Sequence, residues 1–281
     1  MTPAAETRSA TPVTDWAALW RELVDRSSRA APERSGGDFW AGRAQDFHDR
    51  VHGRRNQPDS ARDFVLETVL PGSTVLDIGA GTGAWSIPLA GRAARVTAVD
   101  SSASMIAVLR QNIAKEALAN IDIVPGSWPD VNVETHDYSL AAHSVYGCAD
   151  LPRFVERMQA LTRRTCFLVL HIPVAGGVMA EAATHLWGHP LDSPNFIVAY
   201  NVLLQMGLAP NVLVGQQLSG PRTSATLDDA LARMKRHFGL ADTDEKDAYL
   251  VGLLTRRLEH RDGRYLWPPG TRPALVHWSV E

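Results

Sequence analysis

The chain has 281 residues, of which 45% are hydrophobic and 21% are charged, and its formal net charge is -3. This length can form one large hydrophobic core, or one core with a small accessory region. The charge balance gives no electrostatic reason to expect nucleic acid or an anionic membrane as the main partner.

Cysteine use and hydropathy exclude several further classes. The two cysteines, Cys148 and Cys166, show no CxxC spacing, so we expect neither a disulfide framework nor a cysteine-based metal centre. No apolar run reaches about 18 residues, and the N-terminus lacks the apolar segment of a signal peptide. The sequence therefore predicts a cytoplasmic protein without a membrane span, and it leaves the oligomeric state open.

The first quarter of the chain is predicted to form a tail and three helices. Residues 1–14 are rich in Thr, Ala, Pro and Ser and are predicted to be disordered. Apolar side chains then recur at helical spacing in three stretches, and Pro71-Gly72 is a strong stop signal. Residues 15–71 are therefore predicted to form an N-terminal helical cap.

Strands and helices alternate from residue 72 onward. Short apolar or β-branched runs predict strands at 73–79, 95–100, 121–126, 138–145 and 165–172. Helical spacing separates most of these runs. This order predicts a parallel sheet that is covered by helices on both faces.

The pattern changes after residue 172. Residues 173–195 are irregular and punctuated by glycine and proline, and a helix is predicted at 195–208 and a strand at 211–218. About 50 mostly helical residues then precede a final strand at 272–280. A plain connection would be shorter, so the segments 173–200 and 221–262 are predicted to form a lid or one wall of a pocket.

The stretch "VLDIGAGTGAW", residues 75–85, carries the clearest chemistry. A carboxylate, Asp77, is followed by Gly79, Gly81 and Gly83, and glycines at a strand end let the backbone approach a ligand closely. Because Asp100 lies 21 residues past Gly79, the spacing also fits a dinucleotide fingerprint and leaves NAD open.

The charge of Asp77 favours a different ligand. A carboxylate at the mouth of the loop would repel a pyrophosphate, whereas such loops usually attract anions. A ligand that carries a ribose, an ammonium group and a sulfonium would tolerate or use the negative charge. S-adenosylmethionine (SAM) is such a ligand.

The same region resembles a known family. "VLDIGAGTGAWSIPLA" resembles the first motif of class I, Rossmann-like SAM-dependent methyltransferases of the bacterial small-molecule type, and "VTAVDSSASMI" resembles the second. "IVPGSWPD" resembles the third motif loosely, and the resemblance covers residues 72–172. "FWAGRAQDF" is similar to the N-terminal segment of many bacterial members, whose helix folds over the cofactor.

The resemblance implies a fold and a domain plan. The fold would be an α/β, Rossmann-like doubly wound sheet of about seven strands, mostly parallel with an antiparallel last strand. Residues 72–281 would form the SAM-binding methyltransferase domain, and the helical segment before the last strand would be an insertion in it.

Roles follow for the matching positions of the glycine loop. Gly79, Gly81 and Gly83, with Ala80 between them, would let the loop pass under the methionine part of SAM. Asp77 would lie near the ammonium group. Asp100 would accept hydrogen bonds from both ribose hydroxyls, and hydrogen bonds to a charged acceptor are strong.

Further positions would surround the rest of the cofactor. Ser101 and Met105 would flank the adenine. Ser127 and Trp128 would bind the edge and the face of the adenine, with core packing as the alternative for Trp128. Trp40 and Arg43 could reach the carboxylate of SAM.

The acceptor site is expected at the carboxyl ends of the strands, where open α/β sheets bind ligands. His143 and His171 lie at the ends of the fourth and fifth predicted strands, and the fourth strand faces the methyl group in the family. His143 and Tyr146 are therefore predicted to contact or deprotonate the acceptor. The motif "HSVYG" replaces the Asn-Pro-Pro-Tyr type that many members use to modify planar nitrogens, which argues against that substrate class.

Aromatic residues and two further histidines follow on the acceptor side. A substrate pocket is predicted from His171, Trp187, Phe196 and Tyr200, and core packing is the alternative. His185 and His189 have metal-ligand spacing, but Gly188 and Pro190 interrupt the helix that this spacing requires. We expect no metal.

The sequence thus predicts a cytoplasmic methyltransferase that transfers a methyl group from SAM to an O, N or S atom of a small molecule. Methyl transfer needs alignment of the acceptor more than it needs acid–base chemistry. The alternatives are a protein or RNA methyltransferase, an NAD-linked oxidoreductase and a SAM-binding protein without catalysis. Neither nucleic acid nor membrane is expected as a partner.

Overall fold

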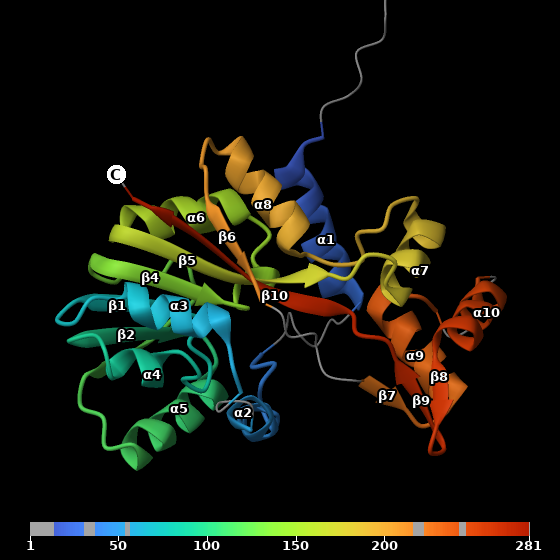
Figure 1. Ribbon diagram of the computed structural model, residues 1–281, viewed down its shortest axis with the longest axis horizontal. Helices are drawn as coiled ribbons and strands as arrows, with labels where there is room; N and C mark the ends of the chain where they lie inside the picture. The colour runs from blue at the N-terminus through green and yellow to red at the C-terminus, as the bar shows by residue number, and fades with distance from the viewer. Residues whose placement is uncertain (1–13, 31–36, 54–56, 216–221, 242–245, 281) are drawn as a thin grey trace, which may run out of the picture.

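The structure is a computed structural model that describes residues 14–30, 37–53, 57–215, 222–241 and 246–280 (Figure 1). The predicted tail, residues 1–14, lies outside the described residues except for its last position. Within the described part of the chain, no helix is long and apolar enough to cross a lipid bilayer.

A seven-stranded sheet forms the centre of the molecule, in the order β3-β2-β1-β4-β5-β10-β6. The strands are β1 (Thr74–Ile78), β2 (Arg95–Asp100), β3 (Ile121–Pro125), β4 (His136–Ala142), β5 (Thr162–Pro173), β6 (Asn211–Val214) and β10 (Thr271–Ser279). The first five are parallel, and β10 runs antiparallel to both β5 and β6. The predicted doubly wound sheet with an antiparallel last strand is confirmed.

Helices cover both faces of this sheet (Figure 1). One face carries α1 (Trp16–Ala30), α6 (Leu151–Ala160) and α8 (Phe196–Gln205), and the other carries α3 (Ser60–Thr68), α4 (Ser86–Ala90) and α5 (Ala103–Lys115). Successive side chains of a strand point to opposite faces. Leu168 and Leu170 of β5 accordingly join the first core, and Phe167 and Val169 join the second.

The three N-terminal helices lie in different places, unlike the single cap that the sequence predicts for residues 15–71. Helix α1 packs on α6 and α8, α2 (Ala44–His52) packs on α5, and α3 packs against β10 and β6. The apolar stripe of each helix finds a different partner, so only α2 and the turn before it lie beside the second motif. Whether these residues act as one domain stays a prediction.

A second lobe stands beyond the carboxyl end of β5 (Figure 1). It contains α7 (Val178–Trp187), α9 (Leu227–Phe238), α10 (Asp247–Arg257) and a small sheet of β7 (Arg222–Ser224), β9 (Arg264–Trp267) and β8 (Glu259–Arg261). This lobe has its own apolar core, to which Phe238, Leu253 and Trp267 contribute.

The second lobe differs from the prediction in two ways. The stretch 173–195 was expected to be irregular, but it contains α7, which begins after Gly177 and ends at Gly188 in a left-handed conformation. Glycine commonly ends helices in this way, and the Ala-rich stretch between the two glycines favours a helix. The small three-stranded sheet was not predicted, because its strands are only three or four residues long.

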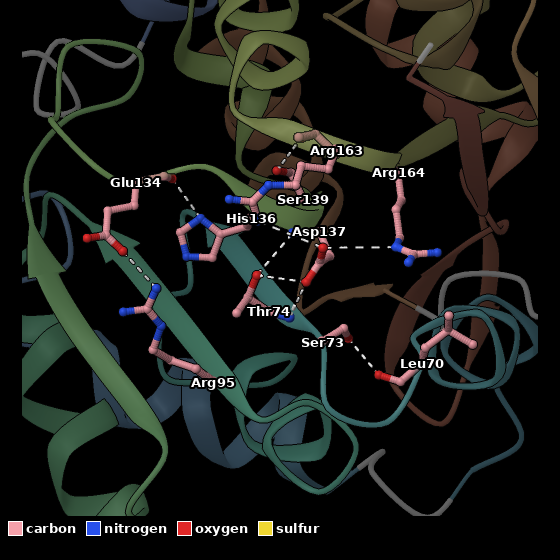
Figure 2. A network of polar contacts seen from close by, with 11 residues as sticks. Leu70, Ser73, Thr74, Arg95, Glu134, His136, Asp137, Ser139, Arg163 and Arg164 are labelled. Carbon is pink, nitrogen blue, oxygen red and sulfur yellow. Dashed lines mark hydrogen bonds and ion pairs between the residues drawn. The ribbon is translucent and has the colours of Figure 1, made fainter.

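A polar network fixes the amino ends of the central strands (Figure 2). The carboxylate of Asp137 accepts hydrogen bonds from the backbone and hydroxyl of Thr74, and Arg163 and Arg164 lie within 3.9 Å of it. Nearby, the ring of His136 bonds to the Thr97 hydroxyl over 2.7 Å. These contacts hold the strands in register at the edge opposite the glycine loop.

Candidate active site

The glycine loop follows β1 and is held against the end of β2. The backbone amides of Gly79 and Ala80 both donate to the carbonyl of Val99, over 2.8 and 2.9 Å. Gly79, Gly81 and Gly83 all have positive φ angles, of 73°, 56° and 91°. Residues with a side chain rarely adopt such angles, so the conformation of the loop depends on its glycines.

The three glycines do not have the same surroundings. A Cβ at Gly79 would lie 2.3 Å from the Cβ of Ser144, and one at Gly83 would lie 2.6 Å from Leu109. A Cβ at Gly81 would meet nothing within 4 Å. Gly79 and Gly83 therefore allow close packing within the protein, whereas Gly81 faces open space.

Asp77 does not lie at the mouth of the loop. Asp77 is 1% exposed, lies next to the last residue of β1, and accepts a hydrogen bond of 2.5 Å from the Ser86 hydroxyl. Burial raises the pKa of this carboxyl to about 7. The carboxylate thus bonds within the protein, and its predicted position near the ammonium group of SAM stays a prediction.

Asp100 ends β2 with a carboxylate that is partly exposed. One oxygen accepts from the backbone amide of Gly81 and the other from that of Ser102, each over 2.8 Å. Burial is the largest cause that raises the pKa of Asp100, and these amides oppose it. The Ser101 amide also contributes, and because a carboxylate offers about four acceptor positions, acceptor capacity remains beside the open face of Gly81.

Three rings stack where β4 and β5 end. The rings of His143 and His171 are 4.1 Å apart and nearly parallel, and the ring of Tyr146 lies 5.6 Å from that of His171. Tyr146 belongs to the short 3-10 helix η2 (Val145–Gly147). Its hydroxyl accepts from the backbone amide of His171 over 2.7 Å and lies 3.4 Å from Nδ1 of His143.

Both imidazoles of this stack are neutral near pH 7. Desolvation by the surrounding protein is the largest cause that lowers the pKa of His143 to about 3, and the neighbouring His171 lowers it further. Burial also lowers the pKa of His171. Both residues are nonetheless exposed to solvent. His143 also has a φ of 56°, and such strained residues cluster at functional sites.

The comparison with known proteins identifies the chemistry. Residues 75–165 match the family model for a methyltransferase domain. This segment contains the glycine loop, Asp100 and the ring pair His143 and Tyr146. The chain carries a class I, SAM-dependent methyltransferase domain. SAM, rather than NAD, is therefore the cofactor of this domain.

Relatives of the methyltransferase act on different kinds of acceptor. Malonyl-[acyl-carrier protein] O-methyltransferase of Serratia marcescens is 29% identical over 74% of this chain and 79% of its own length. A probable ribosomal RNA small subunit methyltransferase A of Methanosphaera stadtmanae is 35% identical, but over 24% of this chain and 25% of its own. The solved structure of the YcgJ protein from Bacillus subtilis has the same fold, with a TM-score of 0.53 and 15% identity over 79% of this chain and 97% of that one.

The residues at the ends of β1 and β2 fit SAM. Gly81 leaves open space beside the loop, and the Asp100 carboxylate keeps acceptor capacity beside that space. Ser101 and Ser127 are exposed at the ends of β2 and β3. This arrangement offers acceptors for a ribose and a backbone that a ligand can approach.

Two predicted adenine contacts have internal roles in the methyltransferase. Met105 is 2% exposed and packs with Ala44 and Val108. The indole of Trp128 donates to the carbonyl of Phe154 over 3.2 Å and packs edge-on against its ring. The hydrogen-bonding edge of Trp128 is thus used within the protein, and only its remaining surface is available to a ligand.

The turn before α2 carries the predicted contacts to the carboxylate of SAM. A hollow there is lined by Phe39, Trp40, Arg43, Asp46 and Arg50. The guanidinium of Arg43 is exposed and lies 4.6 Å from the Phe39 ring, while Trp40 packs with Phe47 on Met105. Arg43 is therefore available to an anion, and Trp40 mainly holds the turn.

The predicted pocket residues are only partly brought together. Trp187 packs edge-on against Phe238 and under the guanidinium of Arg26, so it joins the second lobe to α1. Tyr200 donates to the carbonyl of Pro210, which precedes β6 at the amino edge of the sheet. Phe196, at the start of α8, stacks on the Tyr200 ring with the ring centroids 5.4 Å apart and packs against the core.

Sequence reasoning missed Asp38, Ser102 and Ser144. Ser144 packs on Gly79 and donates to the carbonyl of Ile78 over 2.6 Å. Ser102 caps α5 through Met105, a role that its position just before a helical stretch could have indicated. Asp38 bonds to residues more than 60 positions away, and no local pattern signals such a contact.

Among the described residues, no group of three or more potential ligands could hold a metal ion.

Proposed function

We propose that the protein methylates a small-molecule acceptor that binds against His143, Tyr146 and His171. The observation that carries this proposal is the exposed ring stack at the ends of β4 and β5, beside the edge that fits SAM. The second lobe stands beyond the same ends (Figure 1). It would close one side of the acceptor site.

Charge and similarity support a small acceptor. The net charge of -3 provides no broad attraction for RNA. A relative that matches over 74% of this chain is named for an acyl group on a carrier protein, whereas the RNA-modifying relative matches over 24% of it. The acceptor atom would be O, N or S.

The cofactor would be held by the residues at the ends of β1, β2 and β3. The Asp100 carboxylate would accept from the ribose, and the backbone at Gly79, Ala80 and Gly81 would lie beside the amino-acid part. Ser101 and Ser127 would flank the adenine, and Arg43 would reach the carboxylate. When bound, SAM supplies an activated methyl group that a lone pair of the acceptor can take.

His143 and Tyr146 would orient the acceptor and handle its proton. The Tyr146 hydroxyl can donate to Nδ1 of His143, which would leave a proton on Nε2 to hydrogen-bond an acceptor oxygen. In the other tautomer, a bare Nε2 could take a proton from the acceptor and release it to solvent. A pKa of about 3 makes this imidazole a weak base, so orientation would be its main contribution. Tyr146 stays protonated, because burial raises its pKa.

The test is an acceptor screen with radiolabelled SAM. Purified protein is incubated with metabolite extracts, with total RNA and with a protein lysate, and the labelled fraction is sized. Label in molecules below about 1 kDa supports the proposal, and His143→Asn should remove it. Label only in RNA or protein would instead establish the corresponding alternative. A cytoplasmic location stays a prediction that cell fractionation can check.

A further inference from the structure

Asp38, in the turn before α2, reaches the start of α5. One oxygen of its carboxylate accepts from the Ser102 hydroxyl over 2.7 Å and from the Trp40 amide over 3.1 Å. The other oxygen accepts from the Ser104 amide over 2.9 Å. The α2 region and the second motif, which are 64 positions apart in the chain, are thus joined by one charged side chain.

Ser102 connects this carboxylate to the cofactor edge. The Ser102 backbone amide donates to Asp100, its hydroxyl donates to Asp38, and the same oxygen accepts from the Met105 amide. The backbone amide and the hydroxyl of Ser102 are therefore both used within the protein. Moving Asp38 would free the Ser102 hydroxyl and loosen the amide that holds Asp100.

The other end of the link is the turn that carries Arg43. Asp38 fixes the Trp40 amide, and Trp40 packs with Phe47 against Met105 and Ala44. The only polar tie of α2 to α5 described besides Asp38 runs through His48 and Asn112, whose nitrogens are 3.2 Å apart. Within the described residues, the hydrogen bonds of Asp38 thus attach the start of this turn to the start of α5.

The Asp38 carboxylate is occupied by the protein rather than available to a ligand. Its four acceptor positions serve Ser102, Ser104 and Trp40, and these donors lower the pKa of Asp38 to about 2. Asp38 remains charged under all ordinary conditions. Its hydrogen bonds are therefore of the strong, charge-assisted kind.

We propose that Asp38 is a positioning residue that holds the α2 turn across the SAM site and sets the orientation of Asp100 through Ser102. It acts on SAM binding without contacting SAM. This inference rests on the proposed placement of SAM at the Gly81–Asp100 edge. It makes the orientation of the Asp100 carboxylate depend on a residue outside the methyltransferase motifs.

The test is Asp38→Asn, because an amide of the same shape presents a donor where the structure needs an acceptor. We expect SAM to bind about tenfold more weakly in calorimetry, which corresponds to roughly 1.4 kcal/mol. In the SAM-free protein, hydrogen exchange should quicken at residues 38–52 and stay unchanged in α3. Asp38→Glu, which keeps the charge, should lose less affinity.

The matched control is Asp49→Asn. Asp49 is exposed in α2, which follows the same turn, and its carboxylate accepts from the Gln45 side chain. The change in residue type and charge is therefore the same as in Asp38→Asn. Its SAM affinity and exchange should match those of the wild type. A comparable loss in Asp49→Asn would show that net charge, and not position, sets the effect, and would overturn the proposal.

A double-mutant cycle checks the path through Ser102. If Asp38 acts through this serine, Asp38→Asn combined with Ser102→Ala should bind SAM no more weakly than the worse single variant. Additive losses would overturn the path, and an Asp38→Asn affinity within twofold of wild type would overturn the proposal itself. Asp100→Ala separates the placement of SAM from the role of Asp38. If Asp100→Ala leaves SAM binding intact, the placement of SAM at the Gly81–Asp100 edge is wrong. If Asp100→Ala weakens SAM binding but Asp38→Asn does not, only the role of Asp38 is wrong.

Discussion

The backbone amide of Gly81 donates to the carboxylate of Asp100 over 2.8 Å. This bond joins the first family motif to the second and places an open stretch of backbone beside a carboxylate with spare acceptor positions. The glycine at 81 thus has two tasks: it supplies the donor that orients Asp100, and it leaves the space next to it free.

Gly81→Ala should reduce SAM binding more than stability. Alanine at a φ of 56° costs about 1 kcal/mol, and its methyl group would point into the open space. We expect SAM affinity to fall by at least about tenfold while the melting temperature drops by a few degrees. Calorimetry and thermal melts measure the two effects, and a variant with wild-type affinity would show that the space is not used.

Gly79→Ala should reduce stability more than it reduces SAM binding. Its Cβ would lie 2.3 Å from the Ser144 Cβ, and overpacking of this kind costs about 1–3 kcal/mol. Ser144→Gly in the same chain removes the clashing atom and should restore part of the stability, because the strain of the positive φ remains. Chemical denaturation of the two single variants and the double variant checks this. No recovery in the double variant would mean that the clash is not the cause.

Asp77 should influence stability in a pH-dependent way. Its folded pKa of about 7 lies above the unfolded value of 3.8, so the folded state binds the proton more tightly. Its contribution is therefore most favourable below about pH 4 and is lost as the pH rises toward 7. Asp77→Asn removes this loss, so the stability of the variant relative to wild type should increase from pH 4 to pH 8. A difference that does not change with pH would contradict the assigned pKa.

His143→Asn should slow turnover without changing the shape of the pH–rate profile between pH 5.5 and 7.5. The folded pKa of about 3 means that wild-type His143 stays neutral across this range. Asparagine tolerates the positive φ at this position, so the fold should persist and SAM affinity should hold. A loss of about a hundredfold in rate is expected for an orienting and proton-handling group. An inflection near pH 6.5 that the variant lacks would show that His143 titrates there.

The sequence predicted the sheet well because alternating strands and helices constrain its topology strongly. The antiparallel β10 agrees with the prediction, and the roles of Gly81 and Asp100 stay predictions. The second lobe was predicted only as a helical insertion, since three short strands and one glycine-bounded helix give weak periodic signals. Its packing against α1 through Trp187 depends on residues distant in the chain.

The sequence indicates the backbone of the glycine loop, because a motif fixes it, but it does not reveal which side chains are buried or used within the protein. Asp77 sits in the first motif, yet its burial follows from the central position of β1, which spacing does not reveal. Tyr200 was an aromatic residue on a suitable helix, but its hydroxyl points to Pro210 at the other edge. Asp38 was overlooked because its partners lie in another motif.

The most direct test of the account is calorimetric titration of SAM into the wild type and Asp100→Ala. The variant removes the acceptor for two ribose hydroxyls, and hydrogen bonds to a charged group are worth about 1.5–3 kcal/mol each. We predict binding of one SAM per chain by the wild type, and an affinity roughly thirtyfold to a thousandfold weaker in a variant that melts normally. Equal affinity in the two proteins would contradict the placement of SAM at the Gly81–Asp100 edge.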